Sequence, residues 1–212
     1  MDISFESNRR EYSKHKLNIE DLPKKPIVLL EEWVIAAKKK CLDPTAMTLA
    51  TIRNQNLITQ RTVLLKEIID QKIVFYTNLT SRKAKDIAAN NNVSLHFLWK
   101  KLERQVSICG TATLLERSKV EKYFASRPKE SQIAAIISPQ SQKIESREYL
   151  EQKYQEQLAL SEKQDLKAPD YWGGYIVQPN SFEFWQGREH RLHDRVAYTK
   201  NKDGWSLSRL AP

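Results

Sequence analysis

The sequence predicts an α+β fold, in which an antiparallel β-sheet or barrel carries helices at its periphery. Stretches of alternating apolar and polar residues follow one another across short polar turns, which is typical of antiparallel hairpins. These stretches do not alternate regularly with helices, as the strands of a doubly wound parallel sheet would. At 212 residues the chain suits one domain with its own core. We expect residues 26–212 to form that domain.

The chain begins with a polar and charged segment, residues 1–25, which we expect to be mobile in isolation. Pro26 then suits the first turn of a helix, and Asp43-Pro44 stops that helix. The apolar stripe of this predicted helix consists of Leu29, Leu30, Trp33, Val34 and Ala37.

Nine stretches read as strands because their apolar residues alternate or run together between turn residues. Asn54-Gln-Asn56 and Asp70-Gln-Lys72 are the first two turns. The expected strands cover residues 46–52, 58–66, 73–77, 93–99, 102–115, 172–177, 182–186, 196–199 and 205–210. In the longest, one face is formed by Val106, Ile108, Gly110, Ala112 and Leu114.

Three further helices are expected: one that ends at Arg127-Pro128, one over residues 131–137, and a charged one over residues 145–165 that Pro169 ends. Val120, Tyr123 and Phe124 are the apolar residues of the first.

A short helix is expected after Ser81, which suits its N-cap. Arg82, Lys83 and Lys85 lie in its first turn, where positive charge opposes the helix dipole. A bound anion would offset this opposition, because helix N-termini bind phosphate readily. A surface helix that happens to begin with basic residues explains this segment equally well.

The formal net charge of +9 indicates anionic partners, among which nucleic acid, acidic lipid and phosphorylated small molecules all qualify. The five glycines form neither a Gly-x-Gly-x-x-Gly nor a P-loop motif, which excludes Rossmann-type and Walker-type phosphate sites. If the protein binds phosphate, side chains must therefore do most of the binding.

Neither a membrane-spanning apolar run nor a signal peptide is evident in the sequence. Cys41 and Cys109 stand far apart, outside any Cys-x-x-Cys spacing, so a disulfide or zinc framework is not expected. A reducing cytoplasm fits this cysteine usage.

The segment from Gly187 to Arg195 concentrates positive charge after a strand that ends at Trp185. Three arginines and two histidines lie within eight residues there, and guanidinium groups match phosphate or carboxylate oxygens in pairs. A solvated charged loop is the alternative. His190 and His193 could share a metal on a helix, but Gly187 and the charge density favour a loop, and we expect no metal.

Four basic clusters stand out along the chain, and together they suit two phosphate groups. They are Arg61 with Lys66, Arg82 with Lys83, Arg127 with Ser131, and Arg191 with His193 and Arg195. Arg61 and Lys66 have opposite parity on one strand, so they serve different ligands unless a bulge lies between them.

Several of these motifs resemble the pyridoxamine 5′-phosphate oxidase family, and the resemblance runs in order from Arg9 to Pro212. It is carried by Arg61-Thr-Val-Leu-Leu-Lys66, Phe75-Tyr-Thr-Asn78, Ser81-Arg-Lys-Ala84, Leu102-Glu-Arg-Gln-Val106, Tyr123-Phe124 with Ser126-Arg-Pro128, Ser131-Gln-Ile133, Gln140-Ser141, Trp172-Gly-Gly174, Glu183-Phe-Trp-Gln-Gly187, Arg191-Leu-His-Asp-Arg195 and Arg209-Leu-Ala-Pro212. Ala134 and Ile136 depart from the family pattern, which has Gly and Trp there.

The resemblance implies an FMN-binding split β-barrel that works as a homodimer, with neither nucleic acid nor membrane as a partner. It implies oxidation of pyridoxamine or pyridoxine 5′-phosphate to pyridoxal 5′-phosphate by O2, with release of hydrogen peroxide, in vitamin B6 biosynthesis and salvage. The flavin would supply the redox chemistry, which agrees with the absence of a nucleophile–base motif.

The resemblance also implies site residues. The FMN ligands would be Arg61, Thr62, Val63, Leu64, Leu65, Lys66, Tyr76, Thr77, Ser81, Arg82, Lys83, Gln105, Gln140, Ser141, Trp185 and Arg195. The substrate would contact Arg9, Tyr12, Lys66, Tyr123, Arg127, Ser131, Arg191 and His193. Arg191 and His193 would hold the pyridine ring beside the flavin and act in catalysis.

Two alternatives remain open. A barrel of the same type could bind flavin or pyridoxal phosphate without turnover, although the presence of Arg191 and His193 disfavours this. A nucleic-acid-binding barrel would use the positive charge, but it predicts basic residues interleaved with exposed aromatic residues. The arginines here lie instead in short motifs of mixed polarity.

Overall fold

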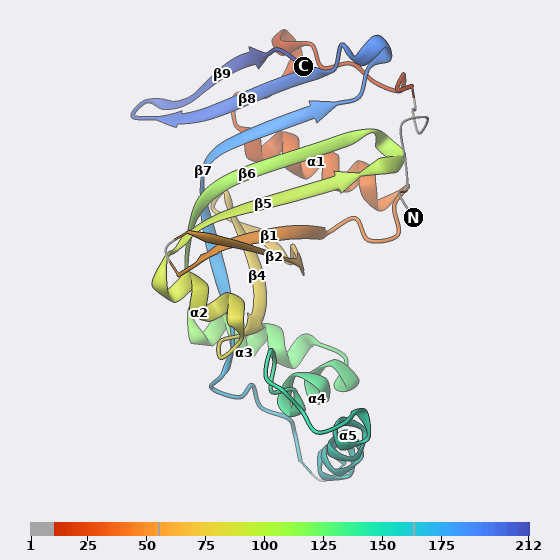
Figure 1. Ribbon diagram of the computed structural model, residues 1–212, viewed down its shortest axis with the longest axis vertical. Coiled ribbons are helices and arrows are strands. Elements are labelled where there is room, and N and C mark those ends of the chain that lie inside the picture. Colours follow the sequence, from red (N-terminus) through yellow and green to blue (C-terminus); the bar gives the residue numbers. More distant parts are fainter. Residues whose placement is uncertain (1–10, 55, 163) are drawn as a thin grey trace, which may run out of the picture. The chain divides into compact units, whose positions relative to one another are not determined.

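The fold is known from a computed structural model, which describes residues 11–54, 56–162 and 164–212. Helices and antiparallel strands confirm the predicted α+β class (Figure 1). The helices are α1 (Pro26–Lys38), α2 (Arg82–Ala89), α3 (Arg117–Ser126), α4 (Lys129–Ile137) and α5 (Arg147–Ser161), with 3-10 turns η1 (Ile19–Asp21), η2 (Lys100–Leu102) and η3 (Glu189–Arg191). None of the helices in these residues is long and apolar enough to cross a membrane.

In the part of the chain that the structure describes, the strands form one nine-stranded sheet. They are β1 (Ala46–Arg53), β2 (Leu57–Leu64), β3 (Glu67–Ile69), β4 (Lys72–Asn78), β5 (Asn92–Trp99), β6 (Arg104–Leu114), β7 (Trp172–Gln186), β8 (Asp194–Asn201) and β9 (Gly204–Leu210). The order is β2-β1-β5-β6-β7-β4-β3, and β8 pairs with β7 and β9. The β3–β4, β4–β7, β7–β8 and β8–β9 pairs are antiparallel.

Contacts divide the chain into two compact units. Unit 1 comprises Met1–Thr48, Ser94–Cys109 and Pro179–Pro212, and unit 2 comprises Leu49–Val93 and Gly110–Gln178. The strands β1, β5, β6 and β7 each contribute residues to both units.

The core of unit 1 is built on α1, whose predicted apolar stripe is buried. Pro26 occupies the start of this helix, where the missing N–H leaves no internal bond unmade. Trp33 packs edge-on against Phe184, with 5.2 Å between ring centroids, and against Trp99 at 6.4 Å. The Arg104 guanidinium lies 4.5 Å from the Trp33 ring, which is a cation–π contact.

The core of unit 2 includes a cluster in which α3 packs on β4 and on the start of β7. Its buried members are Val74, Leu115, Val120, Phe124 and Trp172. Val120 and Phe124 lie one helical turn apart and so share a face of this predicted helix. The neighbouring Arg117 donates hydrogen bonds to the carbonyls of Ala168, Pro169 and Trp172, and these bonds fasten the start of β7 to α3.

The expected strands 172–177 and 182–186 are one continuous strand, β7, so their separation was wrong. A proline fits within such a strand, because its fixed φ suits an extended chain and its missing N–H is harmless where a ladder ends. Pro179 falls between the ladder to β4, which ends at Val177, and the ladder to β8, which begins at Ser181.

The ends of other predicted strands and helices differ from those in the structure. The expected strand 58–66 ends at Leu64, and β3 follows as a separate strand whose existence was not predicted. The helix expected over residues 145–165 ends at Ser161, before Pro169. Leu114, predicted to share one face of its strand with Val106 and Ile108, is 63% exposed at the last position of β6. Ser81 precedes α2 as predicted, yet its side chain makes no capping hydrogen bond.

Candidate functional site

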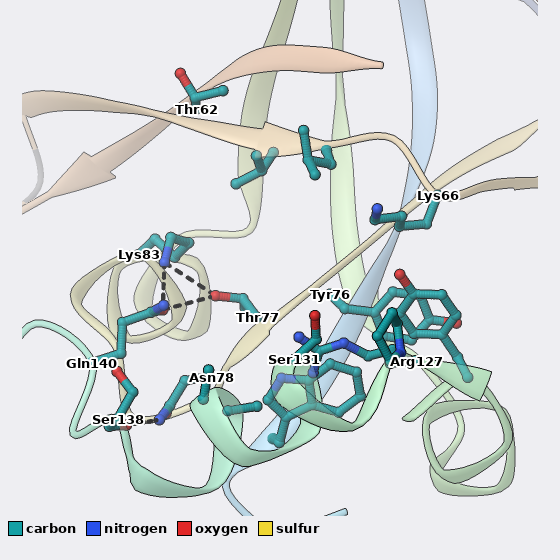
Figure 2. Close-up of a pocket in the computed structure, with 17 residues that line it drawn as sticks. Thr62, Lys66, Tyr76, Thr77, Asn78, Lys83, Arg127, Ser131, Ser138 and Gln140 are labelled. Atoms are coloured by element: carbon teal, nitrogen blue, oxygen red, sulfur yellow. Dashed lines mark hydrogen bonds between the residues drawn. The ribbon is translucent and has the colours of Figure 1, made fainter. Parts of the chain in front are cut away.

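A cavity of about 510 Å³ in unit 2 is lined by side chains from β2, β4, α2, α3, α4, the start of β7 and the loops beside these elements (Figure 2). Many predicted ligands of the flavin and of the substrate phosphate line it: Thr62, Val63, Leu64, Lys66, Tyr76, Thr77, Lys83, Tyr123, Arg127, Ser131 and Gln140. Its other lining residues were not predicted: Asn78, Pro128, Ala134, Ala135, Ser138 and Trp172.

This cavity carries positive charge that no acidic side chain on its wall balances. Lys66, Lys83 and Arg127 line it, and aspartate and glutamate are absent from its described lining residues. A concave site lined by one sign of charge focuses its potential and attracts ions of the opposite sign. The cavity is therefore suited to a phosphorylated ligand.

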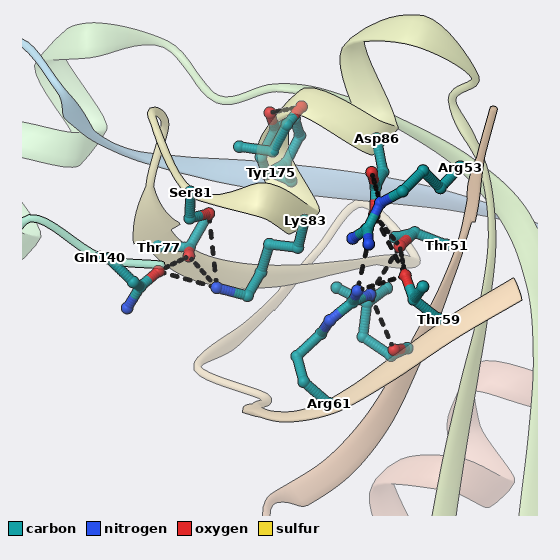
Figure 3. A network of polar contacts seen from close by, with 12 residues as sticks. Thr51, Arg53, Thr59, Arg61, Thr77, Ser81, Lys83, Asp86, Gln140 and Tyr175 are labelled. Carbon is teal, nitrogen blue, oxygen red and sulfur yellow. Dashed lines mark hydrogen bonds and ion pairs between the residues drawn. The ribbon is translucent and has the colours of Figure 1, made fainter. Parts of the chain in front are cut away.

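Lys83 extends from α2 into a set of polar groups. Its Nζ donates to Gln140 Oε1 at 2.8 Å and to Thr77 Oγ1 at 3.0 Å, and Ser81 Oγ lies 3.4 Å away (Figure 2, Figure 3). Burial, with the nearby charge of Arg61 added, lowers the pKa of Lys83 to about 8. An anion that approaches Lys83 would therefore stabilise the protonated form of its side chain.

Arg127 is held against aromatic rings. Its guanidinium carbon lies 4.8 Å from the centroid of Trp172 and 5.8 Å from that of Phe124. Trp172 in turn stacks on Tyr76 at 5.4 Å, and Tyr76 on Tyr123 at 3.9 Å. The aromatic rings hold the position of the guanidinium, and its N–H groups can still make polar contacts.

One nitrogen of Arg127 lacks a hydrogen-bond partner. Among the fully buried side-chain nitrogen and oxygen atoms of the described chain, Arg127 Nη1 is the one without a bond. Buried polar groups are normally paired, so an unpaired donor beside a cavity indicates a ligand position. Burial also lowers the pKa of Arg127, which an acceptor with negative charge would reverse.

A second cavity of about 300 Å³ in the same unit is lined by Arg53, Thr59, Gln60, Arg61, Arg82, Lys83 and Ser141. Arg61, Arg82, Lys83 and Ser141 were predicted as flavin ligands, whereas Arg53 was not predicted. Lys83 lies on the wall of both cavities. Arg61 and Lys66 line different cavities, but the parity argument does not apply to them, because β2 ends at Leu64 and Lys66 lies beyond it.

Two predicted flavin ligands of unit 2 line neither cavity. Leu65 is buried, and Ser81 is fully buried beside Lys83. The remaining predicted residues, apart from Arg9, belong to unit 1. Arg9 lies outside the described residues.

In unit 1, Trp185, His193 and Tyr12 form an aromatic cluster. The Trp185 and His193 rings lie 4.7 Å apart, and Tyr12 meets each edge-on at 5.7 Å. A side chain at Gly187 could not be accommodated, because an added Cβ would lie 2.8 Å from Tyr12 Cβ.

The protonation state of His193 is set by its neighbours. Its Nδ1 accepts a hydrogen bond from the backbone N–H of Arg188 at 3.0 Å. Burial, and then the charge of Arg191, lower its pKa, with Glu11 acting in the opposite direction. At neutral pH the imidazole is therefore neutral, and its proton lies on Nε2.

Arg195 and Arg191 lie close in sequence but have different surroundings. Arg195 donates to Glu183 Oε1 at 2.9 Å and to the Ala211 carbonyl at 2.7 Å. Arg191 is exposed and has a φ of 60°, in a 3-10 turn where a loop was predicted. Gln105 is half-buried on β6. Within the described chain, histidine, cysteine and acidic residues form no group that could bind a metal ion.

Comparison with known proteins identifies relatives. A family model described as pyridoxamine 5′-phosphate oxidase matches residues 35–160, and one described as pyridoxine 5′-phosphate oxidase C-terminal dimerisation region matches residues 172–212. Proteins named pyridoxine/pyridoxamine 5′-phosphate oxidase from Shewanella sp. (strain MR-4) and Shewanella oneidensis are each 54% identical over 205 residues. The match covers 96% of this chain and 97% of each relative.

Solved structures show the same fold. PhzG from Burkholderia lata 383, in complex with tetrahydrophenazine-1-carboxylic acid, is 30% identical with a TM-score of 0.88, covering 94% of this chain and 100% of that chain. A pyridoxamine 5′-phosphate oxidase-related, FMN binding protein from Nostoc punctiforme is 13% identical with a TM-score of 0.74, covering 90% of this chain and 100% of that chain. These likenesses confirm the predicted split-barrel fold. With matches over almost its whole length, the chain belongs to the pyridoxamine 5′-phosphate oxidase family.

Proposed function

We propose that this protein oxidises pyridoxamine 5′-phosphate or pyridoxine 5′-phosphate to pyridoxal 5′-phosphate through a bound FMN, with O2 as the electron acceptor. The alcohol and O2 give the aldehyde and hydrogen peroxide, and the amine with water and O2 gives the aldehyde, ammonia and hydrogen peroxide. This reaction serves vitamin B6 biosynthesis and salvage. Family membership and the names of the curated relatives support it.

The observation that carries the proposal is the larger cavity of unit 2, with three cations, no acidic lining residue and an unpaired N–H of Arg127. Such a wall fits a dianionic phosphate monoester, which accepts several charge-assisted hydrogen bonds. The second cavity, with Arg61 and Arg82, fits another phosphate group. The substrate and FMN each carry one phosphate, so the donor set matches the chemistry of both molecules.

The flavin, when bound, supplies the redox chemistry, and the side chains bind and orient. Arg127, Lys66 and Ser131 would hold the substrate phosphate, while Arg61, Arg82 and Lys83 would hold the phosphate of FMN. In unit 1 the neutral His193 offers an Nε2–H donor and Arg191 a permanent positive charge, both suited to the polar substituents of a pyridine ring.

We further propose that the protein is a homodimer and acts in the cytoplasm. The match of residues 172–212 to a region described as a dimerisation region supports the dimer. The cysteine usage supports a reducing compartment.

The test has two stages. Protein reconstituted with FMN and freed of unbound flavin is expected to retain one flavin per chain, seen in its visible absorption. Addition of pyridoxamine 5′-phosphate should then consume O2 and release hydrogen peroxide and ammonia. Retained flavin without turnover of either phosphorylated substrate would favour the non-catalytic binding protein, and no retained flavin would contradict both.

A further inference from the structure

Asp86 of α2 lies at the centre of a buried polar network in unit 2 that the sequence did not predict (Figure 3). The residue is 5% exposed. A carboxylate so deeply buried is normally paired and hydrogen-bonded, because an isolated buried charge is costly. Here its partners are Arg53, Arg61 and two threonines.

The carboxylate binds Arg53 through two parallel contacts. Arg53 Nε donates to Oδ1 at 3.0 Å, and Arg53 Nη2 donates to Oδ2 at 3.2 Å. This bidentate geometry fixes the plane of the guanidinium as well as its position. The contact leaves the Nη1 group of Arg53 outside the pair, and Arg53 lines the smaller cavity.

The second guanidinium is held through the threonine hydroxyls. Arg61 Nη1 donates to Thr51 Oγ1 and Arg61 Nη2 to Thr59 Oγ1, both at 2.7 Å. Both hydroxyls lie within hydrogen-bond distance of Asp86 Oδ2, at 2.9 Å from Thr51 and 3.1 Å from Thr59. Arginine only donates and a carboxylate only accepts, so each hydroxyl accepts from Arg61 and donates to Asp86.

The network keeps Asp86 charged. Burial alone would raise the pKa of Asp86, but hydrogen bonds from Arg53, Thr51 and Thr59 lower it below its ordinary value. Arg61 Nη2 also lies 3.6 Å from Oδ2, close enough for an ion pair. One negative charge thus holds two guanidiniums that would otherwise repel each other.

The smaller cavity still has a surplus of positive charge. Arg53, Arg61, Arg82 and Lys83 line it, and Asp86 neutralises only one of these four charges. A phosphate monoester carries about −1.5 to −2 near neutral pH, which leaves about +1 after binding. The wall therefore suits a terminal phosphate.

We propose that Asp86 is a positioning residue which fixes Arg53 and Arg61 together, so that Arg53 joins Arg61, Arg82 and Lys83 in binding the phosphate group of the flavin cofactor. This inference rests on the proposed function for the identity of the anion. Asp86 itself does not touch the phosphate.

The role of Asp86 can be tested because electrostatics and positioning predict opposite signs. Asp86→Asn removes one negative charge near the phosphate, which by charge alone should strengthen FMN binding. If Asp86 positions the two arginines, FMN binding weakens instead, because the bidentate contact that holds Arg53 is lost. We expect the dissociation constant for FMN to rise at least tenfold.

The experiment measures binding of FMN and of riboflavin, which lacks the phosphate, to flavin-free protein by quenching of flavin fluorescence. Asp86→Asn and Arg53→Gln are expected to weaken FMN binding and to leave riboflavin binding within about twofold of wild type, since both lesions concern the phosphate alone. The control is Lys85→Gln, an exposed residue of the same helix that lines neither cavity. It should behave as wild type toward both ligands.

Three outcomes would overturn the inference. FMN affinity that is unchanged or higher in Asp86→Asn would refute positioning, and equal losses for FMN and riboflavin would indicate a general structural defect. If Asp86→Asn does not fold, Arg53→Gln, at a side chain 22% exposed, decides alone, and wild-type FMN affinity there would refute the role of Arg53. Wild-type protein that binds neither flavin would instead refute the proposed function.

Discussion

The ammonium nitrogen of Lys83 lies 2.8 Å from the side-chain oxygen of Gln140, a residue from a loop 57 positions further along the chain. This cation lies on the walls of both cavities of unit 2. Because burial and Arg61 lower the pKa of Lys83 to about 8, its charge changes within the pH range in which enzymes are assayed.

FMN affinity is expected to fall as pH rises above about 8. A bound phosphate favours the ammonium form, so the complex loses affinity once Lys83 of the free protein is deprotonated, by at most about tenfold per pH unit for one proton. Titration of flavin-free protein with FMN between pH 7 and 9.5 checks this. Lys83→Arg keeps its charge and should abolish the slope; a slope that persists in this variant would assign the titration to another group.

The same shift has the opposite consequence for the stability of the flavin-free protein. The folded-state pKa lies near 8 and the ordinary value is 10.5, so between these limits the unfolded chain binds more protons. The free energy of unfolding should therefore rise with pH in this window for wild type relative to Lys83→Met. Urea unfolding of both proteins at pH 7.5 and 9.5 measures the difference, and a wild type that gains nothing relative to the variant would contradict the lowered pKa.

Arg127→Ala is expected to raise KM for phosphorylated substrate by tenfold or more and to change kcat far less. Loss of a charge-assisted hydrogen bond costs on the order of 1.5–3 kcal/mol, and a phosphate distant from the reacting carbon is bound about equally in the ground and transition states. Lys129→Ala is the matched control, since this exposed residue lies two positions away and lines neither cavity. An unchanged KM with a collapsed kcat would assign Arg127 to the chemical step.

Arg195→Ala is expected to weaken flavin binding at least tenfold, whereas Arg191→Met keeps the flavin and loses most turnover. Arg195 is braced by Glu183 and the Ala211 carbonyl, while Arg191 is exposed on a 3-10 turn. Flavin content and steady-state rates of both variants test this division. Glu183→Gln is a useful additional variant, because it removes the carboxylate that pairs with Arg195 and leaves the charge of Arg195 in place. Equal flavin loss in Arg195→Ala and Arg191→Met would contradict the two roles.

Each active site is expected to contain residues from both chains of the dimer. Inactive Arg61→Ala and Arg191→Ala proteins, mixed under conditions that exchange subunits, should recover about a quarter of wild-type activity. About half of the dimers are then mixed, and each has one intact and one doubly altered site if these residues serve a site from different chains. No recovery, with exchange confirmed by mass, would place both residues in one chain.

Most of the fold could be predicted because alternating apolar residues and turn residues are local signals. The α1 stripe and the β1–β2 hairpin illustrate this. Continuity through Pro179 could not be predicted, since it depends on where each partner ladder ends.

The residues of the candidate site were predicted less completely. Cationic motifs identified Arg61, Lys83 and Arg127, but Arg53 precedes a polar turn and Asp86 lies on a charged helix, so both resemble ordinary surface residues. Their pairing spans 33 positions and becomes evident only in the folded chain. The stacking of Trp172 beneath Arg127 is a long-range contact of the same kind.

The Nη1 group of Arg127 is a buried donor without an acceptor among the described residues, and such a group has a cost in stability. A buried donor without an acceptor costs on the order of 1–3 kcal/mol, whereas an apolar side chain of similar shape over Trp172 would not bear that cost. Selection for thermostability alone would therefore tend to replace this arginine, whereas selection for binding an anion would retain it. Saturation of the site with a phosphorylated ligand should recover stability that the empty protein lacks.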